Sequence, residues 1–430
     1  MEKIVLNSLF SLVLMTSLIS PQVDACQYNL SVTEMLAEMQ QMRWVHWIEA
    51  LSGERPVSTS EGDGKILTRS NLVMFEPDQA PDAFTFVMET LQGMGFKDNQ
   101  DYEIHTYNFP YEERHPERNW KNLILTIQGT NPDLHQEKVL MVAHLDSISG
   151  KETVLAPGAD DNATGSAGLL EAASVLRHFQ FDRTIHLVWF SGEEYSRVGS
   201  EHFVEDYADW LPNIIGVVNL DMFGYDADDD RCFEVHAGTL TGSKGISDCL
   251  QDAINAYDLG LAFDLIDDKT AYAFSDHFPF WEKDVPAVMI YENGFFQPEK
   301  TCGKTDRNPK YHTIADLLTY INQDTGFSIL QAALATTAHL AEPSKRCFSE
   351  VPKIRELLTH DRRRVIWDSL PGADLYQVWL PQGGDWTLAG ETKNTYWVLS
   401  ADEGRGKGIY KVIAMTNTGC QSAPGSYPTK

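Results

Sequence analysis

Short apolar runs alternate with segments of helical periodicity along most of this 430-residue chain, and this alternation constrains the fold more than any other feature. The runs are rich in β-branched residues and predict strands. The predicted strands span residues 121–128, 138–143, 184–190, 214–220 and 285–291. Helices are predicted within residues 31–51, 83–94, 165–179, 246–257 and 326–340. We therefore expect an α/β fold with a mostly parallel central sheet flanked by helices.

The composition changes after Pro343. From Val351 onward, short alternating strand patterns are separated by glycine-containing turns, and aromatic residues such as Trp367 and Tyr376 stand at core-type positions. These features predict a small all-β sandwich over residues 349–430, which resembles a fibronectin type III domain. The segment carries no catalytic cluster, so we expect either a binding module of unknown partner or a cap that packs on the preceding domain.

The first 25 residues predict a secretory signal peptide. Lys3 precedes an apolar stretch at residues 4–18, and the small residues around Ala25 form a cleavage pattern. Residues 26–345 would then form the main domain of a secreted or periplasmic protein. Cys26 directly follows the cleavage pattern, so lipid attachment is an alternative. No later segment has the length and apolarity expected of a membrane-spanning helix.

The chain is strongly acidic, with a formal net charge of −28 at pH 7. Such a charge repels phosphates and excludes nucleic acid as an expected partner. The six cysteines contain no CxxC pair, which argues against a thiolate zinc site. Export permits disulfides, and the first pair we expect joins Cys232 to Cys249.

A tight turn, PGADDNATG at residues 157–165, concentrates negative charge just before a predicted helix. In one interpretation, Asn162 or Thr164 simply caps that helix by accepting its free N–H groups. In the other, Asp160 or Asp161 binds a metal, because adjacent like charges repel unless a cation lies between them. The residues that follow the predicted strands favour the second interpretation.

Histidines and acidic residues follow four of the predicted strands. In chain order they are His144 and Asp146, Glu193 and Glu194, Asp221, and, further along, Tyr311 and His312. In an open parallel sheet, the carboxyl ends of the strands form one edge, where ligands bind. Imidazole and carboxylate groups are zinc ligands, although other divalent metals also accept them. The sequence therefore predicts a metal site at this edge.

Six motifs in this order resemble a known family, the secreted bacterial di-zinc aminopeptidases of leucyl type, which are co-catalytic zinc exopeptidases. The motifs are HLDS, PGADDNATG, FSGEEYSRVGS, NLDM, SDHFPF and YHTIADLL. The resemblance covers roughly residues 35–345. It implies two zinc ions and peptide substrates with a free N-terminus. One zinc would be held by His144, Asp161 and Asp221, and the other by Asp161, Glu194 and His312.

The resemblance also implies roles for neighbouring residues. Glu193 would be the general base, and Tyr311 would donate a hydrogen bond to the developing oxyanion. Asp146 would orient the ring of His144, and Asp160 would be a non-bridging acid beside Asp161. Candidates for lining or supporting the substrate pocket are His277 and Phe278, together with Phe280 and Phe295.

Three other readings remain open. The scaffold could carry a glutaminyl cyclase, since SDHFPF is similar to a stretch in cyclases, although cyclases bind one zinc and five ligand positions favour two. A carboxypeptidase would need a cation for the substrate carboxylate, and Arg197 and Arg307 lie near the motifs. A non-enzymatic binding protein would be expected to have lost ligands, and none is lost here.

Overall fold

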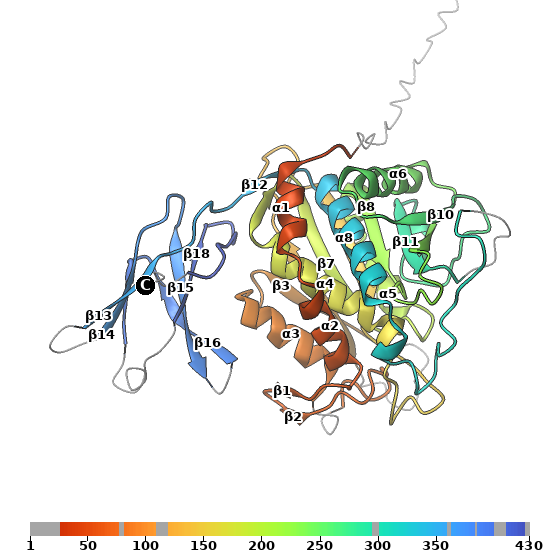
Figure 1. Cartoon of the computed structure of the whole chain (residues 1–430), viewed down its shortest axis with the longest axis horizontal. Coiled ribbons are helices and arrows are strands. Elements are labelled where there is room, and N and C mark those ends of the chain that lie inside the picture. The colour runs from red at the N-terminus through yellow and green to blue at the C-terminus, as the bar shows by residue number, and fades with distance from the viewer. Residues whose placement is uncertain are drawn as a thin grey trace, which may run out of the picture.

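The computed structural model describes most of the chain. The described residues are 26–76, 81–108, 119–294, 301–358, 363–382, 385–399 and 410–425. The predicted signal peptide and Phe295 lie outside these residues. A large α/β body is followed by a smaller all-β part at the C-terminus (Figure 1). Within the described residues, no helix combines the length and apolarity needed to cross a bilayer.

An eight-stranded sheet forms the centre of the body, in the order β10-β9-β11-β8-β5-β7-β4-β3 (Figure 1). Its strands are β3 (Tyr102–Asn108), β4 (Asn119–Ile127), β5 (Lys138–His144), β7 (Thr184–Phe190), β8 (Ile214–Leu220), β9 (Cys232–His236), β10 (Ala262–Ile266) and β11 (Ala287–Glu292). The central strands β11, β8, β5 and β7 run parallel, whereas β9 and β4 pair antiparallel with their inner neighbours. The expected parallel arrangement is confirmed for the four central strands, and antiparallel pairs flank them on both sides.

Helices cover both faces of this sheet. The helices on one face are α1 (Leu30–Glu38), α2 (Gln41–Leu51), α3 (Ala83–Met94), α4 (Thr164–Leu176), α6 (Thr241–Ala256) and α8 (Gln323–Leu340). Those on the other face are α5 (Val198–Asp206) and α7 (Phe278–Glu282). Because strand side chains alternate between faces, Met141 of β5 packs on the first side and Leu140 on the second.

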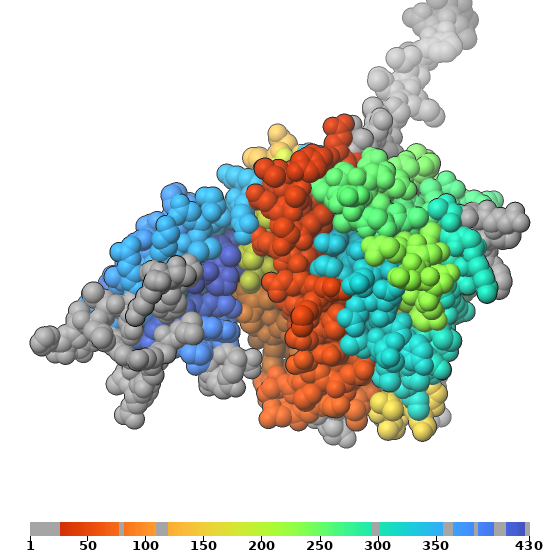
Figure 2. Space-filling view, in the orientation of Figure 1, coloured from red at the N-terminus to blue at the C-terminus, as the bar shows by residue number. Residues whose placement is uncertain are grey.

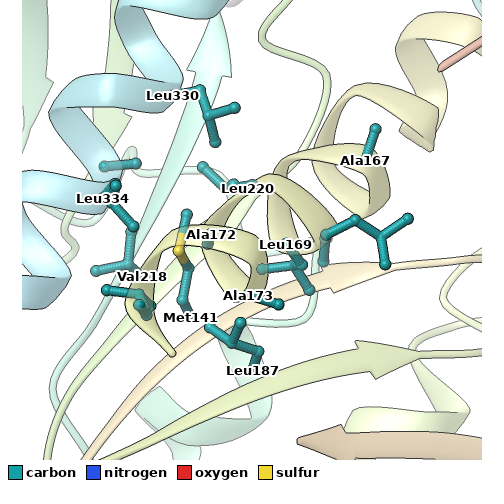
Figure 3. Packing of buried hydrophobic residues seen from close by; sticks show 14 of the residues in the cluster. Met141, Ala167, Leu169, Ala172, Ala173, Leu187, Val218, Leu220, Leu330 and Leu334 are labelled. Atoms are coloured by element: carbon teal, nitrogen blue, oxygen red, sulfur yellow. The ribbon is translucent and has the colours of Figure 1, made fainter. Parts of the chain in front are cut away.

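The larger core lies between the sheet and helices α4 and α8. Figure 3 shows Met141, Leu187 and Val218 from three neighbouring strands beneath small and aliphatic residues of α4. Leu330 and Leu334 of α8, which lies beside α4, join the same cluster. Every residue of α4 is buried, so this helix and the turn before it are held on all sides.

The structure interrupts one predicted helix and shortens another, and it begins α6 and α8 earlier than expected, at Thr241 and Gln323. The expected run at 31–51 is broken between α1 and α2, where the buried Glu171 accepts a hydrogen bond from the Gln40 amide at 2.6 Å and pairs with Arg43. The helix expected at 165–179 ends at Leu176, because the next residues form strand β6 (Phe179–Phe181), which pairs with β12 (Pro343–Arg346). A small hairpin consists of β1 (Val57–Thr59) and β2 (Gly62–Gly64).

The C-terminal part forms two three-stranded antiparallel sheets. One contains β13 (Ile354–Leu358), β14 (Arg363–Trp367) and β17 (Tyr396–Val398); the other contains β15 (Leu375–Gln382), β16 (Asp385–Thr392) and β18 (Lys411–Met415). Trp367 and Tyr376 are buried between them, as expected. The all-β architecture is confirmed, whereas the resemblance to fibronectin type III and the boundary at residue 349 stay predictions.

The C-terminal sheets and the α/β body lie side by side in the space-filling view (Figure 2). Polar contacts join the two parts. The Gln421 amide donates to the carbonyl oxygen of Arg177 at 2.9 Å, and Lys97 forms an ion pair with Glu391. Arg177 directly follows the last residue of α4, so this junction lies at the helix end away from the acidic turn.

All six cysteines form disulfides, and the expected pair is wrong. Cys26 bonds to Cys249 and Cys232 bonds to Cys302, with Cα–Cα distances of 5.0 and 5.3 Å. The third disulfide joins Cys347 to Cys420. The fold brings Cys232 of β9 next to Cys302. The spacing of cysteines along the chain does not predict this neighbour. The disulfide also occupies the Cys26 sulfur that the lipid-anchor alternative required.

Removing a buried leucine from β7 tests this packing. Leu187 is fully buried, so Leu187→Ala should lower the free energy of unfolding by about 2–5 kcal/mol through a cavity and lost apolar contacts. Urea unfolding followed by tryptophan fluorescence measures the change. Leu30→Ala is the control, because Leu30 is 63% exposed and its loss should have little effect. Equal effects of the two substitutions would contradict the described core.

Candidate metal centre

Two glycines shape the loops that carry the candidate ligands. Gly158 has φ of 50°, and a Cβ there would lie 2.1 Å from the carbonyl oxygen of Asp161. Gly192 has φ of 76°, and a Cβ there would lie 2.7 Å from the Trp120 ring. Only glycine fits both the conformation and the space. These turns aim the side chains after β7 and before α4 toward the carboxyl edge of the sheet.

The five predicted ligands converge at that edge. His144 Nε2 lies 3.3 Å from Asp161 Oδ1 and 3.3 Å from Asp221 Oδ1. His312 Nε2 lies 3.1 Å from Asp161 Oδ2 and 2.9 Å from Glu194 Oε2. The two oxygens of Asp161 thus face different histidines, one in each predicted trio. This is the donor arrangement that a carboxylate shared by two metals requires.

The donor set fits divalent metals. Ligand atoms of His144, Asp161 and Glu194 all lie within 4.8 Å of one another. The other carboxylate oxygen of Glu194, Oε1, is buried without a hydrogen-bond partner among the described residues. An unpaired buried carboxylate oxygen is costly unless a cation reaches it. Two imidazole groups and three carboxylate groups are ligands of the types that zinc binds.

The pKa values of these groups reflect crowded negative charge. Burial, together with the negative charge of the nearby Asp161, raises the pKa of Glu194 to about 8. Burial lowers the pKa of His312, but its hydrogen bonds to Asp161 and Glu194 outweigh this and raise it to about 10. Metals held between the carboxylates would stabilise the ionised acids and displace the imidazole protons.

Glu193 lies beside the five ligands, and burial raises its pKa well above the ordinary value. Its backbone amide donates to Asp146 Oδ1 at 3.2 Å, and that of Glu194 donates to Asp146 Oδ2 at 3.2 Å. His144 Nδ1 lies 3.1 Å from the Asp146 backbone oxygen and 3.6 Å from its carboxylate. Asp146 therefore orients His144 mainly through its carbonyl, and its carboxylate fixes the loop that carries Glu193.

Asp160 points away from the histidines. Its Oδ1 accepts a hydrogen bond from the Gly224 amide at 2.9 Å, and its Oδ2 accepts one from Asn308 Nδ2 at 3.1 Å. Asn162 Oδ1 accepts a hydrogen bond from the Gly165 amide at 3.0 Å. The capping and metal interpretations of this turn therefore both describe the geometry, with Asn162 at the helix and Asp161 at the cluster.

The remaining predicted residues take different positions. The Tyr311 ring stacks on His312 with centroids 3.6 Å apart, and burial and nearby carboxylates raise its pKa, so the hydroxyl keeps its proton. His277 is fully buried, and its Nε2 lies 2.8 Å from the Tyr272 carbonyl oxygen, which fits the supporting role rather than lining. Phe278 is partly exposed, whereas Phe280 belongs to the core between the sheet and α5.

The two arginines weighed for a carboxypeptidase contact different aromatic rings. The Arg307 guanidinium is 4.6 Å from the centroid of the Tyr311 ring, next to the ligand His312. That of Arg197 is 5.4 Å from the Phe278 ring, and its Nη2 is 3.7 Å from Glu201.

Two residues that the sequence did not identify bind the backbone of the loops that carry the candidate ligands. Arg69 is fully buried and donates to backbone oxygens of two of the ligand-bearing loops, although the stretch around it matches no motif. Asp316 accepts hydrogen bonds from the amides of Asp160 and Asp161. Asp316 stands in the quoted motif YHTIADLL, four residues after His312, and this position was the available signal.

Curated proteins share sequence similarity with this chain. Leucine aminopeptidase 1 of Trichophyton equinum is 30% identical over 214 residues, which cover 47% of this chain and 53% of the relative. The chain spans about half the length of the curated relatives it matches.

Solved structures share the fold. The Legionella pneumophila LapA aminopeptidase has a TM-score of 0.56 at 21% identity, covering 73% of this chain and 76% of the other. A glutaminyl cyclase of Macrostomum lignano has a TM-score of 0.53 at 17% identity, covering 72% and 92%. At these identities, both similarities show the fold alone.

A model of one family, described as Peptidase family M28, matches residues 122–337, which is half of the chain. The matched segment runs from β4 into α8 and contains all five converging ligands. The chain therefore belongs to peptidase family M28.

Proposed function

We propose that this chain is a secreted, zinc-dependent aminopeptidase that uses two metals to remove N-terminal residues from peptides. The position of Asp161 carries the proposal, because its two oxygens face His144 and His312 separately. A site for one metal does not require a second histidine beside the other oxygen of the same carboxylate. The name of the Trichophyton equinum relative and the membership of a peptidase family support the same activity.

The site residues divide into those that would bind the metals and those that would act on the water and the substrate. His144, Asp161 and Asp221 would hold one metal, and Asp161, Glu194 and His312 the other. Metals held there would lower the pKa of a bound water and polarise the scissile carbonyl.

Glu193 takes the proton of the attacking water and passes it to the leaving amine. Its side chain is only partly exposed, which limits competing water around this proton. Tyr311 remains protonated and donates a hydrogen bond to the oxyanion. The carboxylates around the cluster favour the positively charged α-amine of the substrate, which explains the choice of a free N-terminus.

We extend the proposal to the ends of the chain. The signal sequence predicted at residues 1–25 would export the protein, and three disulfides are compatible with an oxidising compartment. The C-terminal sheets contact the body at Arg177 and Lys97, away from the cluster. Their proposed role is a fibronectin type III-like packing or binding module.

Two substitutions separate the base from the ligands. Glu193→Ala should retain zinc and lower kcat about 10²–10⁴-fold, because only the proton acceptor is lost. Asp161→Ala should lose both bound zinc and activity, since both trios share this residue. Metal analysis and peptide hydrolysis measure the two effects. Glu201→Ala is the control, because that carboxylate is 49% exposed on α5. Full activity in Glu193→Ala would refute the mechanism.

Three forms of one peptide test the substrate class. The free peptide and its C-amidated form should release their first residue, and the N-acetylated form should not, because the acetyl group removes the charged amine. Chelator should abolish the release. Cleavage that depends on a free C-terminus would instead indicate a carboxypeptidase, with Arg307 as the carboxylate partner. If none of the peptides is cleaved, conversion of an N-terminal glutamine would indicate the cyclase.

A further inference from the structure

Arg69 lies beneath the metal-binding loops and outside the segment that matches the family model. The backbone beside it is fixed, because Thr68 forms a bridge with Ala156, whose amide donates to the Leu67 oxygen at 3.0 Å. This pairing places the Arg69 side chain directly under the turn that begins at Pro157. The side chain has no exposed surface.

The guanidinium of Arg69 donates to backbone oxygens of two separate ligand-bearing loops. Nε donates to the Leu145 oxygen at 2.7 Å, between His144 and Asp146. Nη1 donates to the Pro157 oxygen at 2.5 Å, and Nη2 to the Gly158 oxygen at 2.9 Å. A further bond from Nη1 reaches the Leu51 oxygen at the end of α2, at 2.9 Å.

Asp316 holds the same turn through its amides. Asp316 Oδ2 accepts from the Asp160 amide at 3.2 Å and from the Asp161 amide at 3.1 Å. Asn308 Nδ2 donates to Asp316 Oδ1 at 3.0 Å and to Asp160 Oδ2 at 3.1 Å, which fixes the orientation of both acids. A cation thus binds the carbonyl oxygens of the turn, and an anion binds its N–H groups.

We propose that Arg69 and Asp316 are positioning residues that clamp the turn carrying Asp161 from its carbonyl side and its amide side, and so preorganise the shared ligand for two metals. Arg69 also ties this turn to the loop of His144, which fixes the distance between two ligands of one trio. The inference rests on the proposed metal-binding function. Outer contacts of this kind typically change metal affinity about 10–100-fold.

The position of Arg69 requires a guanidinium rather than a positive charge alone. Its planar fork reaches the Leu145, Pro157 and Gly158 oxygens from different nitrogens, whereas a lysine ammonium is a single point of donation. Arg69→Lys therefore preserves charge and removes most of the geometry. In Asp316→Asn, an NH2 group replaces one of two acceptor oxygens and faces amide donors.

Zinc affinity, measured by competition with a chromogenic chelator on the full-length mature chain, tests the proposal. Arg69→Lys and Asp316→Asn should each weaken zinc binding about 10–100-fold. Arg177→Lys is the matched control, since burial lowers the pKa of both arginines to about 10 and Arg177 lies at the opposite end of α4. The control should bind zinc within about twofold of the wild type, even if its thermal stability falls.

The outcomes separate the two proposals. Wild-type affinity in Arg69→Lys or in Asp316→Asn would overturn the assigned clamp while leaving the metal site intact. Equal weakening in Arg177→Lys would also overturn it, because the effect would then be one of general stability. A wild-type chain that binds no zinc would overturn the proposed function and this inference together. If Arg69→Lys does not fold, Asp316→Asn alone decides.

Discussion

The position of Asp161 between His144 and His312 is the contact on which the other features of the site depend. One carboxylate oxygen faces each histidine, and the outer partners Asp221 and Glu194 complete two trios. Bringing these acids together beneath a protein surface costs free energy, because burial and mutual repulsion both disfavour their charged forms. The arrangement becomes favourable when cations lie among the carboxylates, and this links the geometry to metal-dependent chemistry.

The fold assembles this cluster from segments far apart in sequence. Strands β5, β7 and β8 run parallel and side by side, so the residues that follow them meet at one edge. Helix α4 is buried on every side and fixes the turn that carries Asp161 at the same edge. The C-terminal sheets attach near Arg177, at the other end of α4, and contribute none of the described ligands. The candidate ligand cluster and the contact with the C-terminal sheets are therefore separated by the length of a helix.

The sequence predicted the parts of the site that follow from local patterns. The limits 184–190 and 214–220 were correct, because continuous apolar runs of that length fit buried parallel strands. Once those strands were placed, the positions of Glu194 and Asp221 at the sheet edge followed from topology. His312 was also named from its place after the last predicted strand, but it comes well after the end of β11, so its assignment to a metal trio came from the family resemblance.

Features that depend on tertiary contacts could not be predicted in the same way. The break between α1 and α2 results from the buried Glu171, which is more than a hundred residues away in the chain. The disulfide partner of Cys232 is decided by the path of the chain after β11 and not by spacing. Arg69 could not be predicted from the sequence, because its hydrogen-bond partners are backbone oxygens. Every residue has a backbone oxygen, so residue identity does not reveal such a partner.

A crystal structure of the zinc-loaded chain, with anomalous data collected at the zinc absorption edge, tests the central claim most directly. We expect two anomalous peaks, one contacting His144 and Asp221, the other contacting Glu194 and His312, with one oxygen of Asp161 bound to each. A single peak, or two peaks that do not share Asp161, would contradict it.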